Sequence, residues 1–160
     1  MERALEEAKK ALSAGEFPVG CVLVCENEIL VGVSRTGSTS IPINEIDHAE
    51  MVALRKLANL EKQVDPQKIT LYCTMEPCLM CYGALLLSGI QKIVFAYEDV
   101  MGGATRCDRT QLTPLYKNKQ VSITAHVLRN ESLALFKAYF SNPANVYWKG
   151  SLLATYTLGQ

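Results

Sequence analysis

The sequence has no net charge, no long apolar run and no apolar N-terminal stretch, and each absence excludes or disfavours a class of protein. Its 16 basic residues balance its 16 acidic ones, so the chain lacks the overall attraction to phosphate backbones that favours nucleic acid. A local basic patch is not excluded by this balance. No apolar run approaches the length that spans a bilayer, and the charged start of the chain, Met1 to Glu7, is unlike a secretory signal. We therefore expect a cytoplasmic protein with no membrane partner.

Repeats, low-complexity tracts and flexible linkers are also lacking, so residues 1–160 are interpreted as one domain. With 49% apolar and 20% charged residues, the composition is typical of a globular protein. In a reducing cytosol, the six cysteines are expected to be thiols or metal ligands rather than disulfides.

Apolar periodicity predicts strands and helices that alternate along the chain. Helices are predicted over residues 2–14, 48–60, 77–88 and 131–140, with a short one near 109–116. Strands are predicted over residues 18–25, 29–34, 69–74, 92–97 and 121–128, the first two forming a hairpin. A polar loop is predicted over 35–47. This order favours an α/β fold around one five-stranded sheet, and the long connection before the last strand gives room for the last two strands to be parallel.

Two short motifs, each at the start of a predicted helix, together indicate a zinc site. They are His48-Ala49-Glu50 and Pro77-Cys78-Leu79-Met80-Cys81. Cys78 and Cys81 lie one helical turn apart and point the same way, while His48 supplies a nitrogen ligand. A catalytic zinc keeps its fourth position for water, and helix N-termini favour thiolates. Glu50, two residues past a ligand, is expected beside the metal, where it can move protons.

A purely structural zinc site is the alternative interpretation, with Cys73 as the fourth ligand. Such a site has no need of Glu50. Cys73 is therefore interpreted as a buried thiol, as are Cys21 and Cys25. His126 is interpreted as a structural residue of its strand.

The two motifs resemble the signature of the cytidine/deoxycytidylate deaminase superfamily, His-x-Glu followed by Pro-Cys-x-x-Cys. The similarity is to bacterial tRNA adenosine deaminases and to deaminases of free bases such as cytosine and guanine. It is carried by the stretches Phe17–Val24, His48–Arg55, Thr74–Cys81 and Val94–Asp99. The resemblance implies a three-layer α/β/α fold with a mixed sheet, one zinc ion per chain and a homodimer. It also implies hydrolysis of an amino group to a carbonyl, in which Glu50 protonates a ring nitrogen and then the leaving ammonia.

A substrate pocket follows from the same resemblance. Its walls would be Phe17, Val19 and Phe95, with the Ala49 N–H touching the base and Asp99 at the rim.

The end of the second strand departs from the family, whose members usually carry a substrate-binding Asn there. This chain has Ser34, and a hydroxyl offers fewer hydrogen bonds than an amide. Asn44 and Asp47, from the long loop that follows, are alternatives for the missing amide.

The C-terminal segment also departs from the family. Residues 145–156 include the only tryptophan, Trp148, and are nearly uncharged, whereas bacterial tRNA enzymes of this family tend to end in a basic helix. This difference favours a small aminated nucleobase or nucleoside over tRNA. The tail over 141–160 is expected either to close the pocket, with Trp148 as its lid, or to be anchored by Trp148 on the body of the protein or on a partner chain. Two alternatives stay open: deamination of the wobble adenosine of tRNA, and an inactive binding or partner subunit of the same fold. The intact Glu50 argues against the second.

Overall fold

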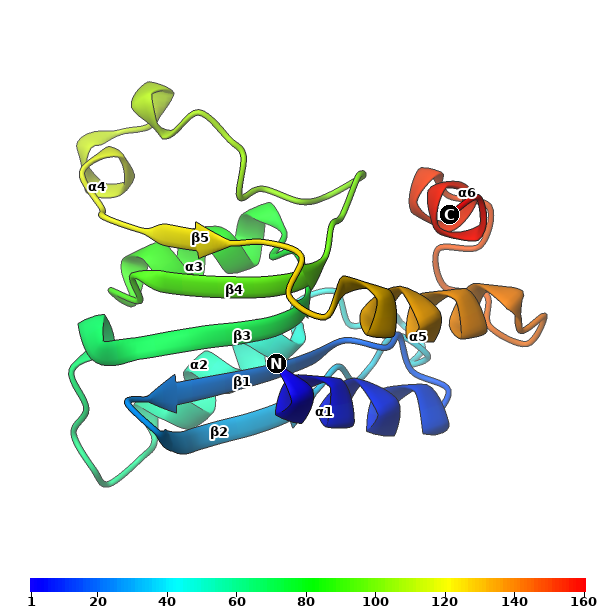
Figure 1. The fold of residues 1–160 in the computed structure, drawn as a ribbon, viewed down its shortest axis with the longest axis horizontal. Coiled ribbons are helices and arrows are strands. Elements are labelled where there is room, and N and C mark those ends of the chain that lie inside the picture. The colour runs from blue at the N-terminus through cyan, green and yellow to red at the C-terminus, as the bar shows by residue number, and fades with distance from the viewer.

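A computed structural model describes residues 1–160, and its centre is one five-stranded sheet in the order β2-β1-β3-β4-β5 (Figure 1). The strands are β1 (Gly20–Cys25), β2 (Glu28–Ser34), β3 (Ile69–Met75), β4 (Lys92–Tyr97) and β5 (Ser122–Thr124). β1 pairs antiparallel with both β2 and β3, whereas β3, β4 and β5 run parallel. The mixed sheet with two parallel last strands is therefore confirmed.

Helices cover both faces of this sheet, which confirms the three-layer α/β/α architecture (Figure 1). They are α1 (Glu2–Ser13), α2 (Ala49–Ala58), α3 (Leu79–Leu87), α4 (Pro114–Lys117), α5 (Arg129–Ser141) and α6 (Leu152–Leu158), with 3-10 turns at Pro66–Lys68 and Arg109–Gln111. α1 and α5 pack on one face, and α2 and α3 lie on the other. None of these helices is long and apolar enough to cross a membrane.

The close approach of α1 to the sheet depends on Gly20 at the start of β1. A Cβ atom there would lie 2.1 Å from the carbonyl oxygen of Ala4 and 2.5 Å from the amide nitrogen of Ala8. Any side chain would therefore push α1 off the sheet, because both neighbours are backbone atoms.

The predicted strand over 121–128 is too long, because β5 ends at Thr124. His126 and Leu128 adopt φ values of 66° and 56°, which no β-strand accommodates. The alternation of apolar and polar residues in the sequence extends beyond Thr124, so the pattern gave no sign of the turn that ends the strand. The helix α6 was not predicted, because it is only seven residues long, carries no charged residue and contains β-branched threonines.

A cluster around Glu98 ties the ends of β4, α5 and α6 together. Glu98 Oε2 accepts a hydrogen bond of 2.8 Å from Arg129 Nε, its Oε1 accepts a second from Arg129 Nη2, and the Tyr156 hydroxyl donates to Oε1 at 2.7 Å. Burial by itself would raise the pKa of Glu98, but these hydrogen bonds outweigh it and lower the pKa to about 2. The C-terminal helix is thus held by a buried charge network.

We expect this network to make stability depend on acid. The folded-state pKa of Glu98 lies below the ordinary value of 4.5, so its contribution is present above about pH 4.5 and is lost as pH falls toward 2. Arg129→Met should lower the free energy of unfolding by on the order of 2 kcal/mol at pH 7, and by progressively less toward pH 3. Urea unfolding across this range measures both values.

The matched control is Lys62→Met, which removes an exposed ion pair with Glu28 and should cost less than about 1 kcal/mol. An equal loss for Arg129→Met at pH 7 and pH 3 would contradict the assignment.

Candidate metal centre and substrate cavity

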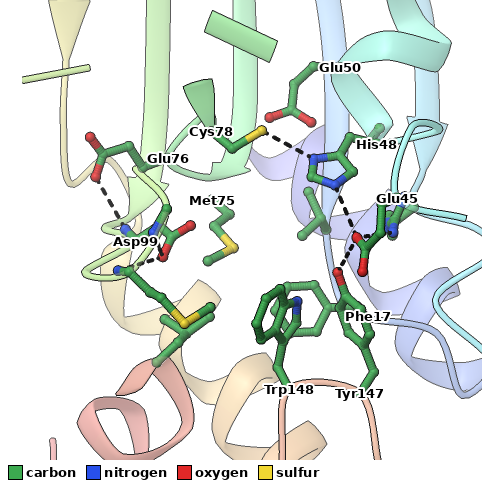
Figure 2. Close-up of a pocket in the computed structure, with 16 residues that line it drawn as sticks. Phe17, Glu45, His48, Glu50, Met75, Glu76, Cys78, Asp99, Tyr147 and Trp148 are labelled. Carbon is green, nitrogen blue, oxygen red and sulfur yellow. Dashed lines mark hydrogen bonds and ion pairs between the residues drawn. The ribbon is translucent and has the colours of Figure 1, made fainter. Parts of the chain in front are cut away.

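Three potential metal ligands meet where α2 and α3 begin. His48 is the N-cap residue of α2, Cys78 is the N-cap residue of α3, and Cys81 lies in the first turn of α3. His48 Nδ1 is 3.5 Å from Cys78 Sγ and 3.6 Å from Cys81 Sγ, and the three ligand atoms all lie within 4.8 Å of one another. Figure 2 shows the imidazole of His48 turned toward Cys78.

These separations fit a zinc ion. Zinc–sulfur bonds of about 2.3 Å and zinc–nitrogen bonds of about 2.0–2.1 Å in a tetrahedron put sulfur and nitrogen about 3.6 Å apart. Two thiolates and one imidazole are also the soft and borderline ligands that zinc prefers. Three protein ligands leave the fourth corner open, as a catalytic site requires.

The two thiols differ in acidity. A hydrogen bond from the Cys81 thiol, aided by His48 and opposed by burial, lowers the pKa of Cys78 to about 4. The pKa of Cys81 is raised, because its thiol donates that bond and is buried. The pKa of His48 is raised by its bond with Cys78, against the effect of burial. At neutral pH the pair therefore already holds one thiolate for a metal.

Glu50 lies on the first turn of α2, beside these ligands (Figure 2). Only 3% of the residue is exposed. Burial raises the pKa of its carboxyl, and a hydrogen bond from the Glu50 backbone amide and the charge of His48 only partly offset this. Cys73 itself is not among the metal ligands. It faces Cys21 across the β1–β3 ladder, and both thiols are buried.

A cavity of about 230 Å³ opens beside the metal ligands. Its apolar walls include Phe17, Val19 and Ala49, and Asp99 stands on the opposite side from His48 (Figure 2). The structure thus brings four of the residues expected in the pocket to the metal centre.

Ser34 and Phe95 do not line this cavity, although the resemblance suggested both. Ser34 turns toward α1, where its hydroxyl donates to Glu7 Oε2 at 3.3 Å. Phe95 is 1% exposed and lies edge-on to His126, with ring centroids 6.0 Å apart. Phe95 thus belongs to the interior of the sheet layer.

Asn44 and Asp47 do not take the place of the missing amide, since both build the loop before α2. The Asn44 side chain donates to Asp47 at 2.8 Å and accepts from the amides of Ile46 and Asp47, while Asp47 pairs with Arg55.

Four polar residues that line the cavity were not predicted as site residues from the sequence: Arg35, Glu45, Glu76 and Tyr147. Glu45 Oε2 accepts a 2.8 Å hydrogen bond from the Tyr147 hydroxyl and lies 3.6 Å from Arg35 Nη2 and 3.8 Å from His48 Nε2. Arg35 is 2% exposed, and its Nη1 has no hydrogen-bond partner. The only signal in the sequence was the position of Glu45 between the two loop residues proposed for this role.

The wall opposite His48 is a loop organised by Glu76. Its carboxylate accepts from the amides of Asp99 and Thr105, at 3.2 Å each, and from the Thr105 hydroxyl. Gly103 packs directly on it, since a Cβ there would lie 2.5 Å from Glu76 Oε2. Asp99 Oδ1 accepts from the amides of Met101 and Gly102 at 2.9 Å, and burial raises the pKa of Asp99.

The C-terminal segment closes the cavity through Tyr147 and Trp148, which lie at the bottom of Figure 2, and Leu153 also lines the cavity. The Tyr147 ring lies 5.3 Å from that of Phe17, in a cluster that includes aromatic residues of α5. The Tyr97 hydroxyl bonds Thr157 of α6 at 2.9 Å. Trp148 therefore lies at the cavity, one of the two positions that the sequence left open for it.

One imidazole and two thiol ligands at paired helix starts, with a buried carboxylate beside them on a mixed sheet, define a zinc-dependent hydrolase. More particularly, the chain belongs to the cytidine and deoxycytidylate deaminase family, because the model of its zinc-binding region matches residues 1–97. That family acts on carbon–nitrogen bonds.

Curated relatives and solved structures agree with this assignment. The tRNA-specific adenosine deaminase of Bacillus subtilis is 36% identical over 88% of this chain and 86% of its own, and that of Haemophilus influenzae is 37% identical over 88% and 80%. A structure from a study of A-to-I editing by tRNA:A34 deaminases has a TM-score of 0.69 at 27% identity, covering 84% of this chain and 96% of the other. The guanine deaminase of Nitrosomonas europaea shares the fold, with a TM-score of 0.66 at 20% identity over 86% and 81% of the two chains.

Proposed function

We propose that this chain hydrolyses an exocyclic amino group of a nucleobase to a carbonyl, with release of ammonia. The observation that carries the proposal is the buried Glu50 carboxyl, with its raised pKa, beside the three donors His48, Cys78 and Cys81. When zinc is bound there, it lowers the pKa of a water molecule and makes it nucleophilic near neutral pH.

Glu50 is proposed to move two protons. Burial raises its pKa, so its carboxyl holds a proton more readily than an exposed glutamate does, as suits a group that both takes and gives protons. It takes one proton from water and delivers it to the ring nitrogen next to the reacting carbon. It then takes the second and delivers it to the amine, which leaves as ammonia. Phe17 and Val19 keep bulk water away from the base, and the Ala49 amide is proposed to contact it.

Adenosine in tRNA is the first substrate to test. Curated relatives with this activity in their names are 32–37% identical over about 88% of the chain, and this similarity does not support the preference for a small substrate that the sequence suggested. Conversion of adenosine to inosine in an anticodon stem–loop, lost steeply as salt is added, would establish it.

A free nucleobase or nucleoside is the second candidate, and one observation favours it. Tyr147, Trp148 and Leu153 wall the cavity, which suits a small ligand enclosed on several sides. Ammonia release should be assayed with adenine, guanine, cytosine and their nucleosides beside the tRNA stem–loop. A zinc-loaded protein that releases ammonia from none of these would instead be an inactive binding or partner subunit.

A cytoplasmic location and a homodimer stay predictions. The mass of the protein in solution at micromolar concentration tests the second.

A further inference from the structure

Apart from Glu50, which is assigned to proton transfer, Glu45 is the carboxylate of the cavity that stands beside the metal ligands and keeps an oxygen free. Its side chain is 50% exposed. Oε2 is held by the Tyr147 hydroxyl at 2.8 Å and lies 3.8 Å from His48 Nε2, whereas Oε1 makes no hydrogen bond in the chain. The other carboxylates differ, because Asp99 and Glu76 are bonded to their own loop on the opposite wall (Figure 2).

The position of Glu45 is fixed from two sides by parts of the chain far apart in sequence. Arg35 is nearly fully buried, and its Nη2 donates to the Asn44 carbonyl at 2.7 Å while lying 3.6 Å from Glu45. Tyr147 holds the same carboxylate oxygen from the C-terminal segment. The buried guanidinium of Arg35 and the hydroxyl of Tyr147 therefore hold the Glu45 carboxylate at the cavity. The imidazole of His48 lies between this carboxylate and the two thiols.

We propose that Glu45 binds the substrate base by accepting a hydrogen bond from a ring N–H, and that it thereby selects bases that carry one. This inference rests on the proposed deaminase function and names the substrate class within it. A carboxylate accepts only, whereas the amide usual at the family's substrate-binding position also donates. Glu45 thus supplies recognition that Ser34, turned toward α1, does not.

The acceptor-only character of Glu45 discriminates between bases. When its leaving amine is turned to the metal, adenosine has only hydrogen-bond acceptors among its ring nitrogens. A ring nitrogen placed against Glu45 would therefore set one acceptor against another. Guanine keeps ring N–H donors, and so do other free bases whose ring nitrogens carry no sugar. A polar group that a bound ligand covers and leaves unpaired weakens the binding of that ligand. The cavity is therefore matched to an aminated free base of the guanine type.

Ligand binding tests the inference without turnover. Zinc-loaded Glu50→Gln protein would be titrated with guanine and with adenosine by calorimetry, and the fluorescence of Trp148, the only tryptophan, gives a second readout because Trp148 lines the cavity. We expect guanine to bind at least about tenfold more tightly than adenosine. Adding Glu45→Gln should weaken guanine binding by about 10- to 100-fold. It should also lower the ratio of guanine affinity to adenosine affinity, because a glutamine amide can donate a hydrogen bond to a ring nitrogen of adenosine.

Two control substitutions separate recognition from general damage. Ser34→Ala and Glu61→Gln, the latter on an exposed carboxylate, should leave the guanine-to-adenosine ratio unchanged. Tyr147→Phe removes only the hydroxyl that holds Glu45 and should weaken guanine binding by a smaller factor, which keeps the test available if Glu45→Gln does not fold.

Methylated ligands test the same contact in the unsubstituted pocket. Methylation of guanine at the ring nitrogen that faces Glu45 should weaken its binding to the protein with Glu45 more than its binding to the Glu45→Gln variant. A steric clash alone would weaken binding to both proteins equally. Either 1-methylguanine or 9-methylguanine is expected to behave in this way. Equal losses for both ligands in both proteins would overturn the contact.

Failure of this inference can be told apart from failure of the deaminase proposal. Ammonia release by the unsubstituted protein, combined with equal binding of guanine and adenosine or with no effect of Glu45→Gln, overturns the role of Glu45 alone. A guanine preference that depends on Glu45, without ammonia release from any base, supports the role of Glu45 and overturns deamination.

Discussion

Glu50→Gln is expected to lower the rate of ammonia release by at least about 10²- to 10⁴-fold on every accepted substrate. Glutamine has nearly the same shape and can occupy the same buried site, but it cannot take a proton from water or give one to the base. Because Glu50 is 3% exposed, an acid on the protein surface does not reach the position of its carboxyl. Steady-state kinetics with an ammonia-coupled assay measures the effect.

The zinc content and melting temperature of Glu50→Gln should stay close to those of the unsubstituted protein, since Glu50 is not one of the three donors. Glu61→Gln, an exposed change of the same chemistry, should retain full activity. Full activity of the Glu50 variant on any accepted substrate would show the proposed mechanism to be wrong.

Cys78→Ser is expected to reduce bound zinc from about one ion per chain to near zero, and activity with it. The Cys78 thiol has a pKa of about 4, so it offers zinc a thiolate at neutral pH, whereas a serine hydroxyl keeps its proton. Loss of the ion also removes the stabilisation that a metal bound only to the folded state provides, so the melting temperature should fall. Atomic emission spectroscopy and thermal unfolding measure the two effects.

Cys107→Ser is the matched control, because Cys107 is an exposed free cysteine outside the metal donors. It should keep its zinc and its melting temperature. Removal of zinc from the unsubstituted protein by a chelator should abolish activity, and added zinc should restore it. Zinc retained at one ion per chain in Cys78→Ser would contradict the ligand assignment.

The metal centre could be predicted from the sequence because its parts are local. His48 and Glu50 share one helix start, and Cys78 and Cys81 share another, so one turn of helix fixes each half. The positions of the strands along the chain followed from similar short-range periodicity. Local sequence alone does not show that the two helix starts lie side by side, and the family resemblance supplied that part of the prediction.

The substrate side of the cavity could not be predicted in this way, because it is assembled over long distances. Tyr147 reaches Glu45 across 102 positions in sequence, and no periodicity connects them. Ser34 was expected in the cavity by its place in the chain, yet its orientation depends on Glu7 of α1. Phe95 was expected there by resemblance, whereas its packing against His126 depends on where β5 ends.

The C-terminal wall of the cavity has a consequence for the order in which the protein is completed. All three metal donors lie within the first 81 residues, whereas Tyr147, Trp148 and Leu153 leave the ribosome well after them. Chains fold largely from the N-terminal side as they are made. A nascent chain can therefore acquire its metal while one side of the cavity is still open to solvent, and the base-binding chamber is closed only by a segment that is translated later.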